Sequence, residues 1–415
     1  MKGYLTFTKK RNFIFLFSEM NQNIIKLLHI AQSEKRLIIG LMSGTSLDGL
    51  DVALCQFEAS GTHTKCELLR FDTIPYTQDI KDKIKVVFAK QQIDFQYFCL
   101  LNEWIGLLHG ELVLQCLESW GIEPSAVGII ASHGQTVMHV PKHQHDFEEF
   151  PNGTLQIGDG DHIAVKTGII TLSDFRQKHV AAGGEGAPLA VYGDFLLFTA
   201  LGENRIMLNM GGIGNFTYLP SDGDAAKVFV TDTGTGNTLM DAYMQEHFKL
   251  PFDENAKIAL EGNINATLLA ALKNHYFFKL PFPKTTGPEV FNLNYLAKAQ
   301  NTSQTQHLAK ADVMATLNRF SAETIAEAIL NTIGNESFQV YASGGGLHNT
   351  LLMSSLKELL PNCTFHTTAA LGTNGDAKEA VLFAVLANEA LAGGATDFGN
   401  RQGVPSVSMG KISFP

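Results

Sequence analysis

One pattern constrains the fold of this chain more than any other, because it occurs twice: short β-rich runs around a glycine turn, followed by helices. In the first half, strands are expected at residues 36–42, 50–57, 65–73, 127–132 and 168–173, with a turn at 43–49. In the second half, strands are expected at 205–210, 215–219, 228–231, 338–342 and 363–367, with a turn at 211–214. No repeat of 20–50 residues occurs, so the pattern predicts a duplicated α/β domain rather than a solenoid.

Helical periodicity accounts for most of the remaining sequence. Helices are expected at residues 78–89, 95–120, 187–201, 237–248, 264–275, 292–300, 310–332 and 376–391, and from about residue 349. The sequence predicts three segments: an N-terminal extension over residues 1–35, outside the fold, and two lobes over 36–200 and 201–415. The lobes are expected to face each other across a cleft, where a ligand would bind.

Composition narrows the class of protein. The 415 residues include 31 Lys and Arg against 41 Asp and Glu, for a formal charge of −10, and 45% are hydrophobic. Such a chain buries a large core, and its acidic balance argues against nucleic acid as a partner. No apolar run reaches the roughly 18–20 residues that cross a bilayer. The five cysteines form no CxxC pair, which indicates a reducing, cytoplasmic setting.

The glycine turns predict phosphate binding. A turn that exposes several backbone N–H groups is an anion nest, and two such turns would clamp the phosphates of a nucleotide. The first turn also carries hydroxyls and the carboxylates of Asp48 and Asp51, which suit Mg²⁺. Taken alone, each turn fits an ordinary hairpin with solvated aspartates better than a phosphate site, and neither is a Walker loop.

Two further glycine segments each follow a strand and open a helix. Residues 232–237 (DTGTGN) would offer an anion the free N–H groups of a helix N-terminus, unless Asp232 and Asn237 simply cap the helix. Residues 344–346 (GGG) carry no side chains, so an adenine ring can lie over that backbone, although close helix–strand packing would also require glycine. His139, His143 and His145 share one loop without a metal-binding spacing, and a solvated loop is expected there.

These segments together resemble anhydro-N-acetylmuramic acid kinases, a family of the actin/hexokinase/Hsp70-type ATPase superfamily. The motifs that carry the resemblance are Gly40–Asp51 (GLMSGTSLDGLD), Ser132–Thr136 (SHGQT), Leu155–Asp159 (LQIGD), Asp174–Arg176 (DFR), Ala181–Leu189 (AAGGEGAPL), Asn209–Asn215 (NMGGIGN), Asp232–Asn237 and Gly344–Gly346. They follow the family's order and cover residues 37–392. The resemblance implies a two-lobed, duplicated ribonuclease H-like fold.

The resemblance also implies a reaction. Water would open the 1,6-anhydro bridge of 1,6-anhydro-N-acetylmuramic acid, and the freed O6 would take the γ-phosphate of ATP, giving N-acetylmuramic acid 6-phosphate in cell-wall recycling. ATP and Mg²⁺ are the implied cofactors, the amino sugar is the implied partner, and the family suggests a homodimer.

Site residues carry over position by position. ATP and phosphate contacts are expected from Gly44, Thr45, Ser46, Leu47, Asp48, Gly49, Leu50, Asp51, Gly211, Gly212, Gly214, Asn215, Asp232, Gly234, Gly236, Asn237, Gly344, Gly345 and Gly346. Substrate contacts are expected from His133, Gln135, Asp174, Arg176 and Glu379, and metal contacts from Asp48 and Asp51. For Glu379, a surface helix carboxylate is the competing interpretation.

The chain departs from the family at the position of the base. Where the family has the Asp that activates water, this chain has His179, and the family's Gln is Glu185. Either His179 takes the proton itself, oriented by a carboxylate that raises its pKa, or Glu185 replaces the lost carboxylate. The alternatives are a kinase for another amino sugar, an inactive pseudokinase, or a non-catalytic, chaperone-like ATP-binding protein.

Overall fold

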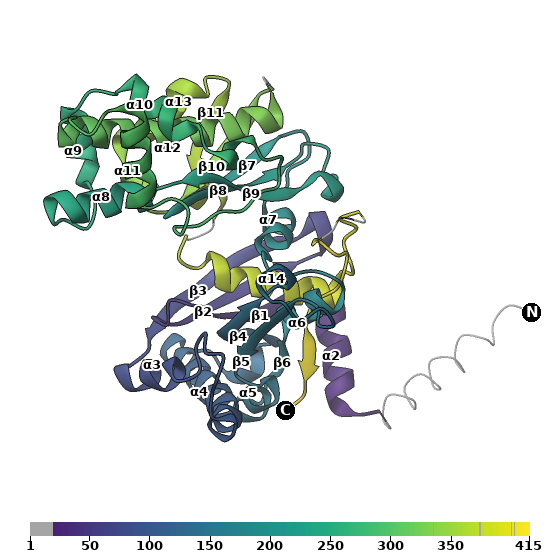
Figure 1. The fold of residues 1–415 in the computed structure, drawn as a ribbon. Helices are drawn as coiled ribbons and strands as arrows, with labels where there is room; N and C mark the ends of the chain where they lie inside the picture. Colours follow the sequence, from purple (N-terminus) through teal and green to yellow (C-terminus); the bar gives the residue numbers. More distant parts are fainter. Residues whose placement is uncertain (1–19, 335, 373–374, 400, 402) are drawn as a thin grey trace, which may run out of the picture. The chain divides into compact units, whose positions relative to one another are not determined.

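The computed structural model describes residues 20–334, 336–372, 375–399, 401 and 403–415. These residues form two compact units (Figure 1). Of the described residues, those up to Leu197 and those from Asp376 to Pro415 form the first unit, and those from Phe198 to Gly375 form the second. The expected N-terminal extension lies partly outside the described residues, which begin at Met20.

The first unit is built on one mixed sheet. Its strands are β1 (Lys35–Ser43), β2 (Gly49–Glu58), β3 (Lys65–Pro75), β4 (Ile129–Val140), β5 (Gly153–Ile157), β6 (Ile170–Ser173) and β12 (Lys411–Ser413). They are arranged in the order β12-β6-β4-β1-β2-β3, with β5 paired to β4. β1, β2 and β3 form an antiparallel meander, and β4 lies parallel to β1.

The helices of the first unit cover both faces of this sheet. They are α2 (Gln22–Gln32), α3 (Gln78–Lys85), α4 (Phe95–Trp120), α5 (Gly160–Thr167), α6 (Phe175–Ala181), α7 (Ala190–Phe198) and α14 (Lys378–Ala392). Alternate residues of β1 point to opposite faces. Ile39 and Leu41 belong to the apolar core that includes α4, whereas Gly40 meets α14. Figure 1 shows α4 and α14 on opposite sides of the sheet.

The second unit repeats the same topology. Its strands are β7 (Arg205–Met210), β8 (Ile213–Leu219), β9 (Phe229–Thr235), β10 (Phe338–Ser343) and β11 (Cys363–Thr367), in the order β11-β10-β7-β8-β9. Again the first three strands form an antiparallel meander, and β10 lies parallel to β7. This shared order confirms the predicted duplicated ribonuclease H-like fold.

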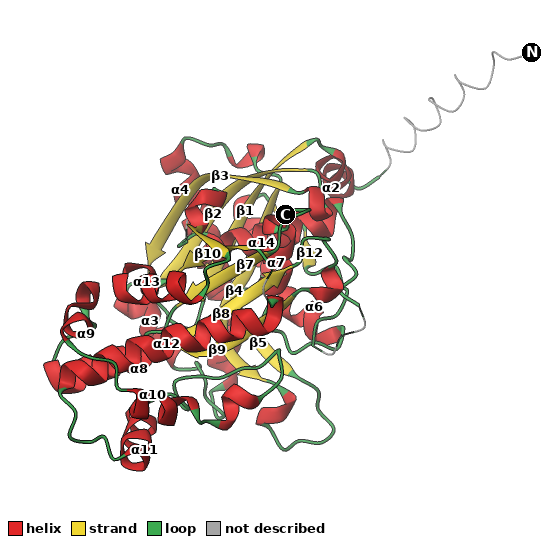
Figure 2. Ribbon diagram, turned by 90° about the horizontal axis from the view of Figure 1, so that it is seen from above, coloured by secondary structure: helices red, strands yellow, loops and turns green. Residues whose placement is uncertain are grey.

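Helices fill the rest of the second unit. They are α8 (Thr238–Phe248), α9 (Lys257–Glu261), α10 (Ala266–Lys273), α11 (Leu293–Ser303), α12 (Lys310–Ile333) and α13 (Thr350–Leu359). One core lies between the sheet and α12 and α13, and a second lies among α8, α9, α10, α11 and α12 (Figure 2). The two cores share the long helix α12.

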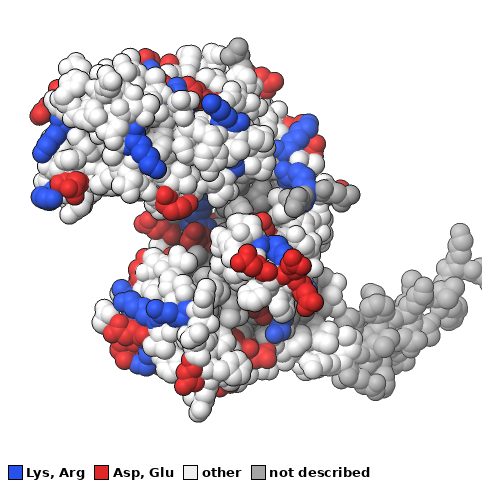
Figure 3. Space-filling view, in the orientation of Figure 1, with Lys and Arg blue, Asp and Glu red and all other residues white. Residues whose placement is uncertain are grey.

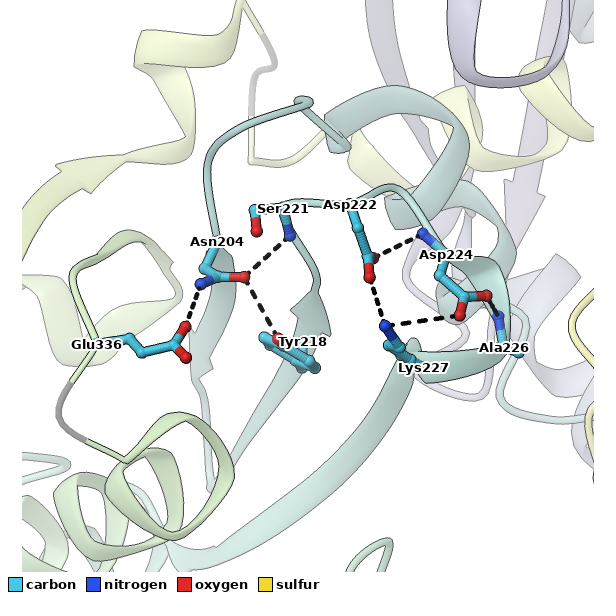
Figure 4. A network of polar contacts seen from close by, with 8 residues as sticks. All are labelled: Asn204, Tyr218, Ser221, Asp222, Asp224, Ala226, Lys227 and Glu336. Carbon is cyan, nitrogen blue, oxygen red and sulfur yellow. Dashed lines mark hydrogen bonds and ion pairs between the residues drawn. The ribbon is translucent and has the colours of Figure 1, made fainter.

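A polar network closes the end of the β7–β8 hairpin opposite its glycine turn (Figure 4). The Asn204 side chain accepts from the Ser221 N–H at 2.9 Å and donates to Glu336 at 2.9 Å. Lys227 pairs with Asp222, and its Nζ lies 3.8 Å from Asp224. These contacts hold the connection from β8 to β9.

The last forty residues differ from the expected lobe boundary. Residues 376–415 were expected in the second lobe, but α14 packs on β1 and β12 pairs with β6, so both belong to the first unit. Helix α2, within the expected extension, also groups with the first unit and contacts α14. Both differences arise from packing between residues hundreds of positions apart, which local sequence patterns do not encode.

The low share of charged residues in the sequence, 17%, is visible on the surface. In the view of Figure 3, most of the visible surface of each unit is uncharged, and basic and acidic side chains are interspersed on it. Among the helices of the described residues, none is both long and apolar enough to span a bilayer.

Candidate active site

The first predicted phosphate turn connects β1 to β2 at residues 44–48. Thr45, Ser46 and Asp48 are exposed, whereas Leu47 is buried with a positive φ of 55°. Gly49 has no room for a side chain, since an added Cβ would lie 2.3 Å from the Ile74 carbonyl oxygen. The turn is therefore anchored at its far end by tight packing and presents its polar side chains outward.

The two carboxylates of this turn are each held by a hydroxyl. Ser46 donates to Asp48 at 2.6 Å, and Thr73 donates to Asp51 at 2.6 Å. Burial raises the pKa of Asp51, the Thr73 hydrogen bond opposes that shift, and the nearby carboxylates of Asp48 and Asp376 add to it. The turn thus concentrates negative charge, which a cation would neutralise.

Gln135 lies beneath the turn and not on its surface. It is fully buried; its Oε1 accepts from the Ser43 hydroxyl at 2.6 Å, and its Nε2 donates to the Gly44 carbonyl at 2.8 Å. Gln135 was predicted to contact substrate, but all these contacts are with the protein itself. Its position therefore makes it a support of the turn.

His133 and Arg176 form a buried pair from β4 and α6. His133 Nδ1 faces the carbonyl oxygens of Gly134 at 2.7 Å and Ser43 at 3.1 Å, so this nitrogen carries the proton. Its Nε2 accepts from Arg176 Nε at 2.7 Å. Burial, together with the smaller effect of the Arg176 charge, lowers the pKa of His133 to about 3, so the imidazole is neutral. His133 orients Arg176.

Glu379 lies in the first turn of α14, where the charges of Arg176 and Asp51 act on it. An added Cβ on Gly40 would lie 1.9 Å from the Ala380 carbonyl oxygen, so α14 begins in direct contact with β1. Burial raises the pKa of Glu379, the Arg176 charge lowers it, and Asp51 raises it again. Glu379 is therefore within electrostatic reach of Arg176 and the phosphate turn, while its side chain is exposed, as the competing interpretation of a surface helix carboxylate expects.

His179 is fully buried at the end of α6. Its Nδ1 accepts from the Gly186 N–H at 2.9 Å, so its Nε2 carries the proton and lies 3.1 Å from the Tyr192 hydroxyl. Tyr192 in turn donates to the Pro405 carbonyl at 2.8 Å. Burial, together with the smaller effect of the Arg176 charge, lowers the pKa of His179 to about 4. The expected pairing with a carboxylate that raises this pKa is wrong.

Glu185 lies on the surface of the loop that His179 holds. Its half-exposed carboxylate is 3.8 Å from His143 Nδ1. The backbone beside it is held at three points: Asn152 donates to the Gly184 carbonyl, Arg176 donates to the Gly186 carbonyl, and Gly186 donates to His179. The loop that carries His143 is exposed, which confirms the expected solvated loop, and His143 lies beside Glu185.

Asp174 has a different environment from the other predicted substrate residues. It begins α6 with a positive φ of 58° and makes no capping hydrogen bond with its side chain. Its carboxylate lies 3.7 Å from Lys411 Nζ on β12. Burial raises the pKa of Asp174, while Lys411 lowers it. The observed partner of Asp174 is thus the C-terminal strand.

In the second unit, the helix N-terminus predicted to bind an anion is already paired. The N–H groups of Gly236 and Thr238 donate to the Gly212 carbonyl, and that of Asn237 donates to the Gly211 carbonyl. The expectation of free N–H groups at the start of α8 is therefore wrong. Side-chain capping by Asp232 or Asn237 is wrong as well, because the Asn237 side chain makes no capping hydrogen bond and Asp232 accepts from the Thr286 N–H instead.

The predicted nucleotide elements of this unit nevertheless lie together. Asn237 Nδ2 donates to the Met210 carbonyl at 3.1 Å, and an added Cβ on Gly345 would lie 3.7 Å from the same Nδ2. Added Cβ atoms on Gly344 and Gly346 would clash with Met210 at 2.7 Å and 2.6 Å. The structure thus joins the glycine turn, the start of α8 and the glycine loop after β10.

Asp232 and Asn215 face each other across β8 and β9. Asp232 accepts from the Thr286 N–H at 2.8 Å, and its own N–H donates to the Lys284 carbonyl at 2.9 Å. Burial raises the pKa of Asp232 to about 6, the Thr286 hydrogen bond opposes this, and Glu289 adds to it. This carboxylate is therefore only partly ionised near pH 6.

Some residues that sequence reasoning missed also lie in these networks. Tyr76, at the end of β3, and His109, in the middle of α4, connect to Ser43 beneath the first turn. Tyr192 buttresses His179 from α7. Only an unusual residue type, a histidine on an otherwise apolar helix face, marks His109 in the sequence.

The chain is similar to known proteins along nearly its whole length. The family model described as anhydro-N-acetylmuramic acid kinase matches residues 36–411. A protein of that name from Pseudoalteromonas atlantica is 59% identical over 400 residues, covering 95% of this chain and all of the relative. Another from Caldanaerobacter subterraneus is 38% identical over 394 residues, covering 94% of this chain and all of the relative.

Proposed function

Since the chain belongs to the anhydro-N-acetylmuramic acid kinase family, we propose that it opens 1,6-anhydro-N-acetylmuramic acid and phosphorylates it with ATP. Water adds its oxygen to C1, and the bond from C1 to O6 breaks. O6 takes the γ-phosphoryl group, ADP leaves, and the proton of the water is released. The observation that carries the proposal is the family match along nearly the whole chain, with the glycine elements present in both units.

The glycine turns and the glycine loop are assigned to ATP. The exposed Thr45, Ser46 and backbone of the first turn suit the phosphates. In the second unit, the turn at residues 211–214 is assigned to the phosphates and Gly345 to the adenosine. Positioning and electrostatic stabilisation account for most catalysis of phosphoryl transfer, so rigid supports beneath these loops matter for rate.

Glu185 is the group that we assign to the proton of the water. It is an ionisable carboxylate on a loop held at three points, close to Arg176 and His139. His179, at the family's usual base position, has its basic nitrogen occupied by Gly186. His179 therefore acts as a positioning residue that holds the loop. Glu185 supplies the carboxylate that other members of the family carry at the position of His179.

Arg176 and Glu379 are assigned to the sugar. The Arg176 guanidinium is oriented by His133 and by the Gly186 carbonyl, and Glu379 lies near it at the start of α14. Opposite charges at this position suit a substrate that carries both hydroxyl groups and a carboxylate.

Asp48 and Asp51 fit a magnesium ion, because Mg²⁺ takes one or two carboxylates together with phosphate oxygens. Bound there, Mg²⁺ would neutralise charge on the phosphates of ATP. Cytoplasmic location and a homodimeric state remain proposals drawn from the family.

The reaction is tested by incubating the protein with ATP, Mg²⁺ and 1,6-anhydro-N-acetylmuramic acid in ¹⁸O-labelled water. The sugar should gain the mass of one water and one phosphoryl group, with the label at C1. Phosphorylation of another amino sugar with no product here would instead identify a different kinase, and no product with any sugar would identify a pseudokinase.

A further inference from the structure

A chain of buried polar side chains runs beneath the first phosphate turn. The Ser43 hydroxyl lies 2.6 Å from Gln135 Oε1 and 2.8 Å from the Tyr76 hydroxyl. The Tyr76 hydroxyl lies 2.8 Å from His109 Nε2. Ser43, Tyr76, His109 and Gln135 come from β1, the end of β3, α4 and β4, and each is at most 4% exposed.

The donors and acceptors of these four side chains allow only one direction of hydrogen bonding along them. Both Gln135 amide hydrogens are used, because Nε2 donates to the carbonyls of Gly44 and Thr136, at 2.8 and 3.0 Å. Its Oε1 must therefore accept the single proton of Ser43, which shares a weaker contact of 3.2 Å with the Gly49 carbonyl. Tyr76 then donates to Ser43, and the chain requires His109 to donate to Tyr76 through Nε2.

This direction fixes the state of His109. With the proton on Nε2, its Nδ1 is a bare acceptor, and within the described residues that atom is buried with no hydrogen-bond partner. A second proton there would be a buried donor without an acceptor, which is costly. Burial accordingly lowers the pKa of His109 to about 4. His109 thus remains neutral and continues to donate at physiological pH.

The helix that carries His109 is locked in place around it. Asn102, two turns earlier in α4, accepts from the Gly158 N–H at 2.9 Å, and an added Cβ on Gly158 would lie 3.6 Å from His109 Nδ1. Added Cβ atoms on Gly106 and Gly110 would clash with α5, at 2.8 Å from the Asp159 carbonyl and 2.9 Å from Lys166. The imidazole is therefore held by packing on both sides.

We propose that His109 and Tyr76 are positioning residues for ATP: through Ser43 and Gln135 they hold the Gly44 end of the phosphate turn. The chain begins on a helix in the core and ends on the carbonyl of the first glycine of the turn. This assignment rests on the proposed function for the role of that turn. It predicts an effect on nucleotide affinity out of proportion to any effect on stability.

The test compares Tyr76→Phe with Tyr97→Phe. Tyr97 is the control, because its hydroxyl lies in the same unit but outside this set of hydrogen bonds: it is half-buried and donates to the Lys83 carbonyl at 3.1 Å. Tyr76→Phe should weaken ATP affinity, measured by calorimetry, about tenfold and raise the KM for ATP similarly, with the KM for the sugar within twofold. Tyr97→Phe should leave both KM values unchanged.

Two variants of His109 test the far end of the chain. His109→Gln places an amide donor near the position of Nε2 and should keep ATP affinity within about threefold, whereas His109→Leu should match Tyr76→Phe. Equal ATP affinity in Tyr76→Phe and Tyr97→Phe would overturn the proposal. If His109→Leu binds ATP as tightly as the wild type, His109 is not a positioning residue for ATP. Because ATP affinity is measured without turnover, a failure of the proposed reaction would be seen separately, as absence of product in the wild type.

Discussion

Gly186 shows at the scale of single residues how neighbours determine a role. Its N–H donates to His179 and its carbonyl accepts from Arg176, so two side chains from α6 hold the backbone next to Glu185. The histidine at the expected base position is thereby engaged, while the carboxylate one residue before Gly186 stays available. A pattern of residue types alone left these two assignments open.

Variants of Glu185 and His179 separate the base from its support. Glu185→Gln should lower kcat by about 10²–10⁴-fold, the usual contribution of a general base, with ATP affinity unchanged. His179→Ala should also lower kcat, because the Gly186 N–H loses its acceptor. His179→Asn offers an amide oxygen near the position of Nδ1 and should restore much of the activity. Loss of activity in His179→Asn with full activity in Glu185→Gln would make His179 the base.

His109 also predicts a pH dependence of stability. Its pKa is about 4 in the folded chain against 6.5 when unfolded, so between these values only the unfolded state binds the proton. The free energy of unfolding therefore rises with pH by up to about 1.4 kcal/mol per unit from this group, and the contribution is lost as pH falls. In His109→Gln the slope should be smaller by this contribution, while those of His133 and His179 stay. Urea titrations at pH 4.5 to 7.5 would check this, and an equal slope in both proteins would contradict it.

At the scale of elements, the contact between β1 and α14 links the two ends of the chain. β1 carries no side chain at Gly40, where the Ala380 carbonyl approaches, and the first turn of α14 brings Glu379 beside Arg176. The glycine thus sets the depth at which α14 packs. It is needed for close approach, since its φ lies outside the left-handed region.

Gly40→Ala should therefore destabilise the first unit, by about 1–3 kcal/mol as for other overpacked cores. Trp104 and Trp120, the chain's two tryptophans, both lie in α4, so tryptophan fluorescence during urea unfolding reports on this unit. Gly394→Ala is the control, because an added Cβ there meets nothing within 4 Å. Equal unfolding midpoints for the two variants would contradict the packing argument.

At the scale of the whole molecule, the first unit is discontinuous in sequence and the second is a continuous insertion. The first unit needs α14 to cover one face of its sheet and β12 to pair with β6, whereas residues 198–375 contain both cores of the second unit. The first unit is therefore completed only by residues that follow the whole second unit in the sequence.

A chain that ends at Gly375 should accordingly lose the first unit and keep the second. Its tryptophan emission should shift toward that of the unfolded protein. Hydrogen exchange should be fast in β1 and β4 while β10 and α12 stay protected, since they make their contacts within residues 198–375. Slow exchange throughout β1 in the truncated chain would show that α14 is dispensable.

The sequence by itself determined the duplicated meander, most helices and the family, because hydrophobic periodicity and glycine turns are local signals. It did not predict the short elements β5, α5, α6, α9 and β12, or α2, which lies within the expected extension, and it ended β4 too early, at residue 132. Only the tertiary structure decided the partners of His179, the unit to which α14 belongs and the hydrogen bonds that connect His109 to Ser43. Each of these depends on contacts between distant segments, and burial gives a polar group its role only once those segments meet.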